Sequence, residues 1–229
     1  MDLPLLYEDA DIVAVAKPAG LITHSDGRMQ EATAEEWFKE KYPSGSGYVH
    51  RLDRDTSGVL IFAKNAEAYE FLRKAFHDRE VHKTYLAFVY GVPKKKEGVI
   101  DFDIGRSRKD FRLRSAQPKA KGRLRDALTR YKVVGEADGY ALLKMSPETG
   151  RTHQIRVHLK AIHHPILGDT LYAPNHPPAL GLNRLGLHAY SLDLPLPSGA
   201  RVTITAPLPS DLAPALKKFP DANEMFALP

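Results

Sequence analysis

The 229-residue sequence contains no cysteine, which excludes disulfide bonds, thiolate metal sites and cysteine nucleophiles together. Long apolar runs are also lacking, since none approaches the roughly 20 residues that a membrane-spanning helix needs. The first residues, Met1-Asp2-Leu3-Pro4, have neither the basic region nor the cleavage site of a signal peptide. These absences predict a cytoplasmic protein without a membrane partner.

Positive charge is concentrated in one part of the chain. The net charge is +5, but the segment from Lys94 to Arg125 alone holds twelve Lys or Arg against four Asp or Glu. Such a segment predicts a surface that faces a polyanion, with Arg106, Arg108 and Arg112 as candidate phosphate contacts. A solvated loop with no partner is the alternative interpretation.

The pattern of apolar residues predicts an α+β fold. Hydrophobic residues at 43% and charged residues at 27% are typical of a soluble globular protein. Short strands are expected at 5–7, 12–16, 59–63, 85–90, 187–194 and 201–205, and a hairpin at 127–134 and 140–145 around a turn at 136–139. Helices are expected after a Thr33/Glu36 capping box, from an Asn65 cap to about Glu80, from Thr152 to about Ile162, and from Ser210. Strands outnumber helices, so the central sheet should be mostly antiparallel or mixed, with flanking helices.

The stretch from His50 to Gly58 presents an acid in a setting suited to chemistry. Asp53 is predicted to lie on a loop that enters the buried strand 59–63. Arg51 and Arg54 flank it, and nearby cations keep a carboxylate ionised, so that it can act as a nucleophile or a base. An ordinary ion pair within the loop is the alternative.

A second dense cluster runs from Thr149 to His158. His158 falls on the apolar stripe of the expected helix and is predicted to be a hydrogen-bonded core residue, whereas His153, Arg156 and Lys160 lie on a polar stripe. The neighbouring histidines do not fit a metal frame, because His153 and His158 are about 140° apart around a helix. No metal site is expected.

Both clusters resemble the RluA-type pseudouridine synthases. The motif His-Arg-Leu-Asp, two variable residues, Thr-Ser-Gly matches at all seven fixed positions of 50–58, and Thr-Gly-Arg-x-His-Gln-Ile/Leu-Arg matches at 149–156. Similarity continues at 164–169, 187–189 and 206–209. The resemblance implies that Asp53 is the catalytic residue and that Arg156 forms an ion pair with it. It further implies that Tyr85 packs against the target base and that Arg51 enters the RNA where the flipped base was.

The resemblance implies conversion of uridine to pseudouridine in rRNA or tRNA, with no cofactor and no metal. We expect a single catalytic domain over residues 1–229 that acts as a monomer, without a separate N-terminal RNA-binding domain, because strand signals begin by residue 5. The sequence departs from the family at 125–129, where Lys-Pro-Ala-x-Thr is more usual. One rival is a non-catalytic RNA-binding protein. Another is a glycoside hydrolase, which needs a second carboxylate in a comparable setting.

Overall fold

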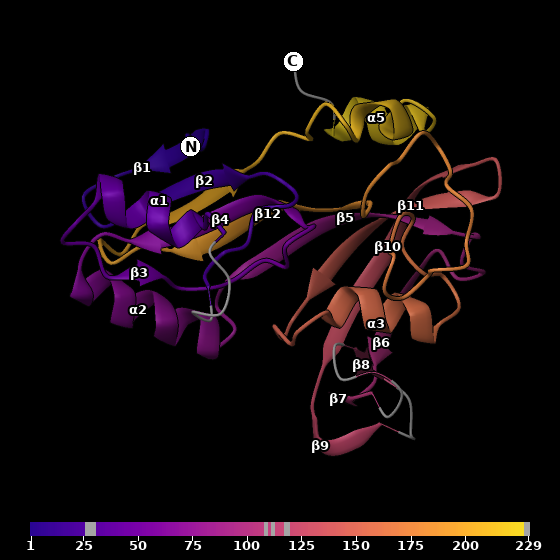
Figure 1. The fold of residues 1–229 in the computed structure, drawn as a ribbon, viewed down its shortest axis with the longest axis horizontal. Helices are drawn as coiled ribbons and strands as arrows, with labels where there is room; N and C mark the ends of the chain where they lie inside the picture. Colours follow the sequence, from indigo (N-terminus) through magenta and orange to yellow (C-terminus); the bar gives the residue numbers. More distant parts are fainter. Residues whose placement is uncertain (26–30, 108–109, 111–112, 117–119, 227–229) are drawn as a thin grey trace. The chain divides into compact units, whose positions relative to one another are not determined.

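The computed structural model describes residues 1–25, 31–107, 110, 113–116 and 120–226 (Figure 1). It contains two compact units, one of Met1–Lys83 with His188–Pro207 and one of Thr84–Leu187 with Leu208–Pro229. Within the described residues no helix is long and apolar enough to cross a membrane. The single catalytic domain over 1–229 stays a prediction.

The expected α+β class is confirmed. Helices and strands follow one another as β1 (Leu5–Glu8), β2 (Ile12–Lys17), α1 (Ala34–Lys41), β3 (Gly47–Tyr48), β4 (Ser57–Ala63), α2 (Ala66–His77), β5 (His82–Tyr90), β6 (Glu97–Asp101), β7 (Ile104–Arg106), β8 (Arg114–Ser115), β9 (Lys121–Arg125), β10 (Leu128–Ala137), β11 (Tyr140–Pro147), α3 (Gln154–Ala161), β12 (Leu187–Pro195), β13 (Arg201–Thr205), α4 (Ala213–Leu216) and α5 (Pro220–Phe226).

The first unit is a mixed sheet with a helix on each face. Its strands lie in the order β1-β2-β4-β12; β3 pairs with β4 and β13 with β12. Among the described pairs of strands in this unit, only β4–β12 is parallel. Because side chains alternate along a strand, Val59 and Ile61 pack with Leu72 of α2, while Phe62 stacks on Phe38 of α1 at 4.6 Å between ring centroids.

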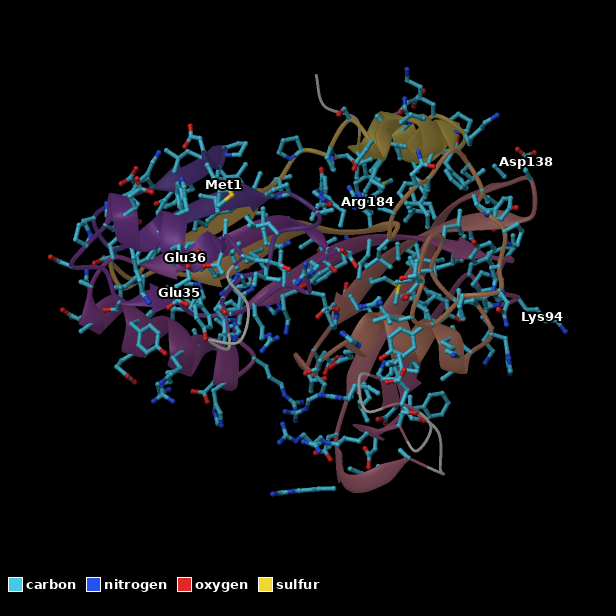
Figure 2. All side chains as sticks on the ribbon, in the orientation of Figure 1. Met1, Glu35, Glu36, Lys94, Asp138 and Arg184 are labelled. Carbon is cyan, nitrogen blue, oxygen red and sulfur yellow. The ribbon has the colours of Figure 1, made fainter. Side chains whose placement is uncertain are left out.

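Helix caps in the first unit follow the sequence closely. The Thr33/Glu36 capping box is present at α1, and the Asn65 side chain accepts the N–H of Ala68 at the start of α2 (Figure 2 labels Glu36). α2 ends at His77, three residues before the predicted end. Arg79 lies in the left-handed region at a φ of 63°, which stops the helix.

The second unit has a four-stranded antiparallel sheet in the order β5-β11-β10-β6. The predicted hairpin forms, but β10 runs to Ala137, so the turn is shorter than the predicted 136–139. Asp138 and Gly139 make the turn at φ values of 52° and 80°, as a two-residue hairpin loop requires (Figure 2).

Helices cover both faces of this second sheet (Figure 1). α3 packs its Ile155 and Leu159 with Ala87 and Val89 of β5. On the other face Phe219, which precedes α5, contacts Phe88 at 5.9 Å between ring centroids. The single helix expected from Ser210 is instead two short ones, separated just before Pro220, because the residue before a proline disfavours the helical conformation.

The basic segment contains strands that the sequence did not predict. Its described parts form β6 at the edge of the main sheet of the second unit, and a small separate sheet in the order β8-β7-β9. Arg106 ends β7. Arg108 and Arg112 lie outside the described residues.

Candidate active site

Asp53 lies where predicted, on the loop between β3 and β4. The Thr56 N–H donates to the Asp53 carbonyl at 3.1 Å and closes a turn immediately before β4. Asp53 is half-buried and Arg51 is exposed on the same loop. Arg54, the second flanking arginine, forms its ion pair with Glu31 at 2.7 Å.

A buried lysine holds the chain directly after Asp53. The Lys17 side chain is 1% exposed, and its ammonium donates to the carbonyls of Pro18, Leu21 and Arg54 at 2.9, 2.7 and 3.0 Å. The Gly20 N–H donates to the same Arg54 carbonyl at 2.9 Å. A buried ammonium that donates to three acceptors avoids most of the cost of leaving water, so it acts as a rigid clamp.

A buried hydroxyl holds the residue directly before Asp53. The Thr23 hydroxyl donates to the Leu52 carbonyl at 3.0 Å and accepts the Leu52 N–H at 3.2 Å. The backbone is therefore fixed on both sides of Asp53, through contacts with the chain at residues 17–23.

The end of the motif is tied to β12 and to the residue after β13. Ser57 Oγ lies 2.9 Å from His188 Nδ1, and His188 Nε2 lies 3.1 Å from the Ala206 carbonyl. A carbonyl only accepts, so Nε2 carries the proton and Nδ1 accepts from the Ser57 hydroxyl. Gly58, at a φ of 124°, is paired with Ala189, and a Cβ there would lie 2.1 Å from the Ala189 carbonyl oxygen. Only glycine fits this position.

His50, the first residue of the motif, is structural. Its Nε2 accepts the Ile61 N–H at 3.2 Å, and its ring stacks on Phe76 at 5.0 Å between centroids. Burial, with a smaller contribution from Lys83, lowers the pKa of His50 to about 3. A histidine that stays neutral at physiological pH is a poor candidate for the acid of the reaction.

Tyr85 lies in the second unit, near the start of β5 and opposite Met145 of β11. It is half-buried and packs against the cluster that includes Ile155 and Leu159, so it shares one face of the sheet with α3. Tyr85 therefore points to the face of the sheet that α3 covers, and α3 carries Arg156, the other candidate residue of this unit.

Arg156 is buried, although the sequence places it on a polar stripe. Its Nε and Nη2 donate to the two oxygens of Asp169, both at 2.8 Å, and the side chains are 5% and 0% exposed. The Asp169 carboxylate also accepts the N–H groups of Leu171 and Tyr172 at 3.0 Å each. Asp169 therefore fixes one edge of the guanidinium. The predicted ion pair of Arg156 with Asp53 joins different units and stays a prediction.

Tyr172 contacts all three side chains that the sequence places on the polar stripe. Its ring lies under the Arg156 guanidinium at 5.0 Å and the Lys160 ammonium at 5.6 Å, which are cation–π distances. Its hydroxyl lies 2.8 Å from Nδ1 of His153. His153 is in the left-handed region at a φ of 58°, which is why α3 begins at Gln154 rather than at Thr152. Sequence reasoning missed both Asp169 and Tyr172 as partners of the motif.

Two other residues of the cluster from Thr149 to His158 have structural roles. His158 is fully buried between the Thr129 hydroxyl and the Phe102 carbonyl, at 2.9 and 3.0 Å, so the predicted core role is confirmed. Gln154 accepts from the Thr149 hydroxyl at 2.7 Å and from the Arg151 N–H at 2.9 Å, and so braces the loop before α3. Among the described residues, no three His, Asp or Glu side chains are grouped as metal ligands would be.

The chain is similar to proteins of one known family. A family model described as RNA pseudouridylate synthase matches residues 11–161, which include the Asp53 loop, Tyr85 and Arg156. The chain is also 39% identical over 192 residues to the dual-specificity RNA pseudouridine synthase RluA of Vibrio cholerae, over 83% of this chain and 76% of the relative. This chain belongs to the RluA-type RNA pseudouridine synthases.

Other members of the family are similar over more of the chain. The ribosomal large subunit pseudouridine synthase D of Nitrosomonas europaea is 37% identical over 227 residues, covering 94% of this chain and 64% of the relative. The solved structure of human RNA pseudouridylate synthase domain containing 1 matches this pseudouridine synthase with a TM-score of 0.77 and 28% identity, over 93% of this chain and 87% of that one.

Proposed function

We propose that this chain converts uridine to pseudouridine in structured RNA, either rRNA or tRNA, with Asp53 as the catalytic residue and no cofactor. In this reaction the bond between N1 of uracil and C1′ of ribose breaks, the uracil rotates, and a bond between C5 and C1′ forms. C5 gives up its hydrogen as a proton and N1 takes one up, so the reaction is redox-neutral.

The observation that carries the proposal is the anchoring of the Asp53 loop. Leu52 and Arg54, on either side of Asp53, are held by Thr23, Lys17 and Gly20. A reacting carboxylate has to be fixed to within about 0.5 Å, and a loop anchored on both sides provides that precision. The carboxylate then attacks C1′ or removes a proton from the sugar, and both alternatives need its charge.

Three further residues have proposed roles around Asp53. Arg51 occupies the place of the extruded base, which offsets part of the few kcal/mol that flipping costs. Its exposed position on the Asp53 loop supports this role. Tyr85 packs against the uracil. Arg156 pairs with Asp53 through the Nη1 side of its guanidinium, since Asp169 occupies the Nε and Nη2 edge.

The names of two relatives support the choice of RNA. One is named for the large ribosomal subunit and another is named a dual-specificity RNA enzyme. We therefore propose that the uridine modified by this chain lies in rRNA or tRNA and that the reaction takes place in the cytoplasm. A monomeric state stays a prediction.

The test compares Asp53→Asn with Asp55→Asn, a half-buried carboxylate two residues further along the same loop. Tritium release from RNA labelled at uridine C5 measures turnover, and filter binding measures RNA affinity. Asp53→Asn should lower turnover by about 100-fold or more while binding stays within about three-fold, because the amide keeps the shape and loses the charge. Asp55→Asn should retain activity. An Asp53→Asn protein with wild-type turnover excludes Asp53, and a wild-type protein that binds RNA without tritium release favours the non-catalytic alternative.

A further inference from the structure

The second unit contains a cavity of about 460 Å³ whose wall is dominated by arginine. Its lining residues come from the small β8-β7-β9 sheet and from the loop at residues 150–152 that leads into α3; these strands and α3 are labelled in Figure 1. We call it the arginine pocket, after its lining side chains Arg106, Arg114, Arg123, Arg125 and Arg151. Among the residues that the structure describes, the remaining lining residues are Ile104, Thr152 and three glycines, and none of these is acidic.

The pocket arginines differ from most other arginines of the protein. Within the part of the chain that the structure describes, none of the five has a carboxylate at ion-pair distance. Arg114 and Arg151 instead donate to the carbonyls of Leu113 and Asp126, at 3.4 and 3.0 Å. By contrast, carboxylates pair with six arginines elsewhere: Arg54, Arg73, Arg130, Arg156, Arg184 and Arg201.

The strand register brings two of these charges together. Arg106 of β7 lies directly opposite Arg114 of β8. Like charges at opposed positions destabilise a sheet, so this arrangement favours the presence of an anion. Two lining glycines leave room for one: among the described residues, no atom beyond the glycine and its chain neighbours lies within 4 Å of where a Cβ would stand at Gly122 or Gly150.

We propose that the arginine pocket binds phosphate groups of the RNA substrate, in the stretch of strand that runs past the start of α3. This inference rests on the proposed function. Guanidinium groups match phosphate oxygens with two parallel hydrogen bonds, which is the reason for arginine rather than lysine in such sites. A cavity of this volume admits a phosphate together with its sugar, since pockets for small ligands begin at about 300 Å³.

The pocket is tied to α3 by hydrogen bonds. The Tyr172 hydroxyl accepts the backbone N–H of Arg114 at 2.9 Å and lies 2.8 Å from Nδ1 of His153, the residue before α3. The same tyrosine packs against Arg156. Phosphate bound in the pocket therefore lies against the elements that hold Arg156 in place.

The test removes two exposed charges from β9 with the double variant Arg123→Gln/Arg125→Gln. Its matched control, Lys94→Gln/Lys95→Gln, removes two exposed charges from the same basic segment but outside the pocket lining. Lys94 projects at the right of Figure 2, far from β9 at the bottom of Figure 1, which has the same orientation. RNA affinity is measured between low and high salt. The pocket variant should lower the slope of log affinity against log salt by roughly 1.4 to 1.8, which corresponds to two phosphate contacts.

The control should change the slope by less than one contact, and Arg123→Lys/Arg125→Lys should restore most of the slope, because lysine keeps the charge. The proposal is overturned if the salt slope of the pocket variant equals that of the wild type or that of the Lys94→Gln/Lys95→Gln control. Competition with ATP and with inorganic phosphate distinguishes the source of the phosphate. ATP that binds wild type at micromolar concentration and loses affinity in the pocket variant, with an unchanged RNA slope, also overturns the proposal and assigns the pocket to free nucleotides.

The two hypotheses fail separately. If wild type releases no tritium from labelled RNA while the pocket variant still lowers the salt slope, the proposed function is wrong and the pocket stands. If wild type is fully active and the slope is unchanged in the pocket variant, the pocket is wrong and the function stands.

Discussion

Replacing Asp169 with asparagine tests how Arg156 is held. Oδ1 of Asp169 accepts three donors, Arg156 Nη2 and the N–H groups of Leu171 and Tyr172, whereas Oδ2 accepts Arg156 Nε. An asparagine has one oxygen, which the three donors would retain, so its NH₂ would face Arg156 Nε–H. Two donors would then oppose each other in a site where the arginine side chain is 5% exposed. Removing one partner of a buried ion pair costs about 3 to 5 kcal/mol of unfolding free energy, and we expect Asp169→Asn to fall in that range.

The protein contains a matched control for this experiment. Arg184, labelled in Figure 2, makes the same two-bond contact with Asp211, at 2.8 and 2.7 Å, but the Asp211 side chain is 53% exposed. Asp211→Asn should therefore cost about 1 kcal/mol or less, because water replaces the lost partner. Urea unfolding at neutral pH measures both variants. If the two lose the same free energy, the buried carboxylate is not the anchor of Arg156, and the structural explanation of the motif fails.

Three further predictions concern the motif residues. Arg156→Lys should slow tritium release by about ten-fold or more although the charge is kept, because lysine lacks the planar fork; wild-type turnover would exclude Arg156 from the site. The pKa of His50 is lowered from 6.5 to about 3, so its contribution to stability is complete above pH 6.5 and is lost as pH falls toward 3. Urea unfolding at pH 7.5 and pH 5 should show a loss of about 2 kcal/mol from this group, absent in His50→Gln; equal losses in both proteins would contradict the assignment. Gly58→Ala places a Cβ 2.1 Å from the Ala189 carbonyl oxygen and should cost about 2 kcal/mol or more; an unchanged melting temperature would show that the β4–β12 contact is not close.

Most of the fold was predictable because local signals and burial agree. The strands β2 and β4 are largely continuous apolar runs. The Thr33 and Asn65 side chains form the helix caps that the sequence predicts. The strands β7 and β9 were missed because they are short and rich in glycine and arginine, without the apolar alternation on which strand prediction relies. Their pairing depends on register with each other, which no single segment encodes.

The site was predictable in its position but not in its support. The Asp53 loop follows from a turn and a buried strand that are adjacent in sequence. Its contacts with Thr23 and Lys17, and those of Arg156 with Asp169, join residues that are 13 to 37 positions apart. Such contacts are fixed by tertiary packing, so nothing in the spacing of these residues indicated them.

The hydrogen bonds give a physical reason for the length of the first motif. His50 caps a backbone N–H of β4, Leu52 is held by Thr23, Ser57 is held by His188, and Gly58 allows β12 to approach. Four of the seven fixed positions therefore have structural roles, which would be needed to hold any acidic residue in place on this loop. A match to the motif is consequently strong information about geometry and weaker information about which atom reacts, and the chemistry has to be tested at Asp53 itself.

Variants of the four structural positions should lower stability and activity together, whereas Asp53→Asn should lower activity alone. Measuring unfolding free energy and turnover on the same set of variants separates the two classes, and an Asp53→Asn protein that unfolds as readily as Gly58→Ala would contradict this division.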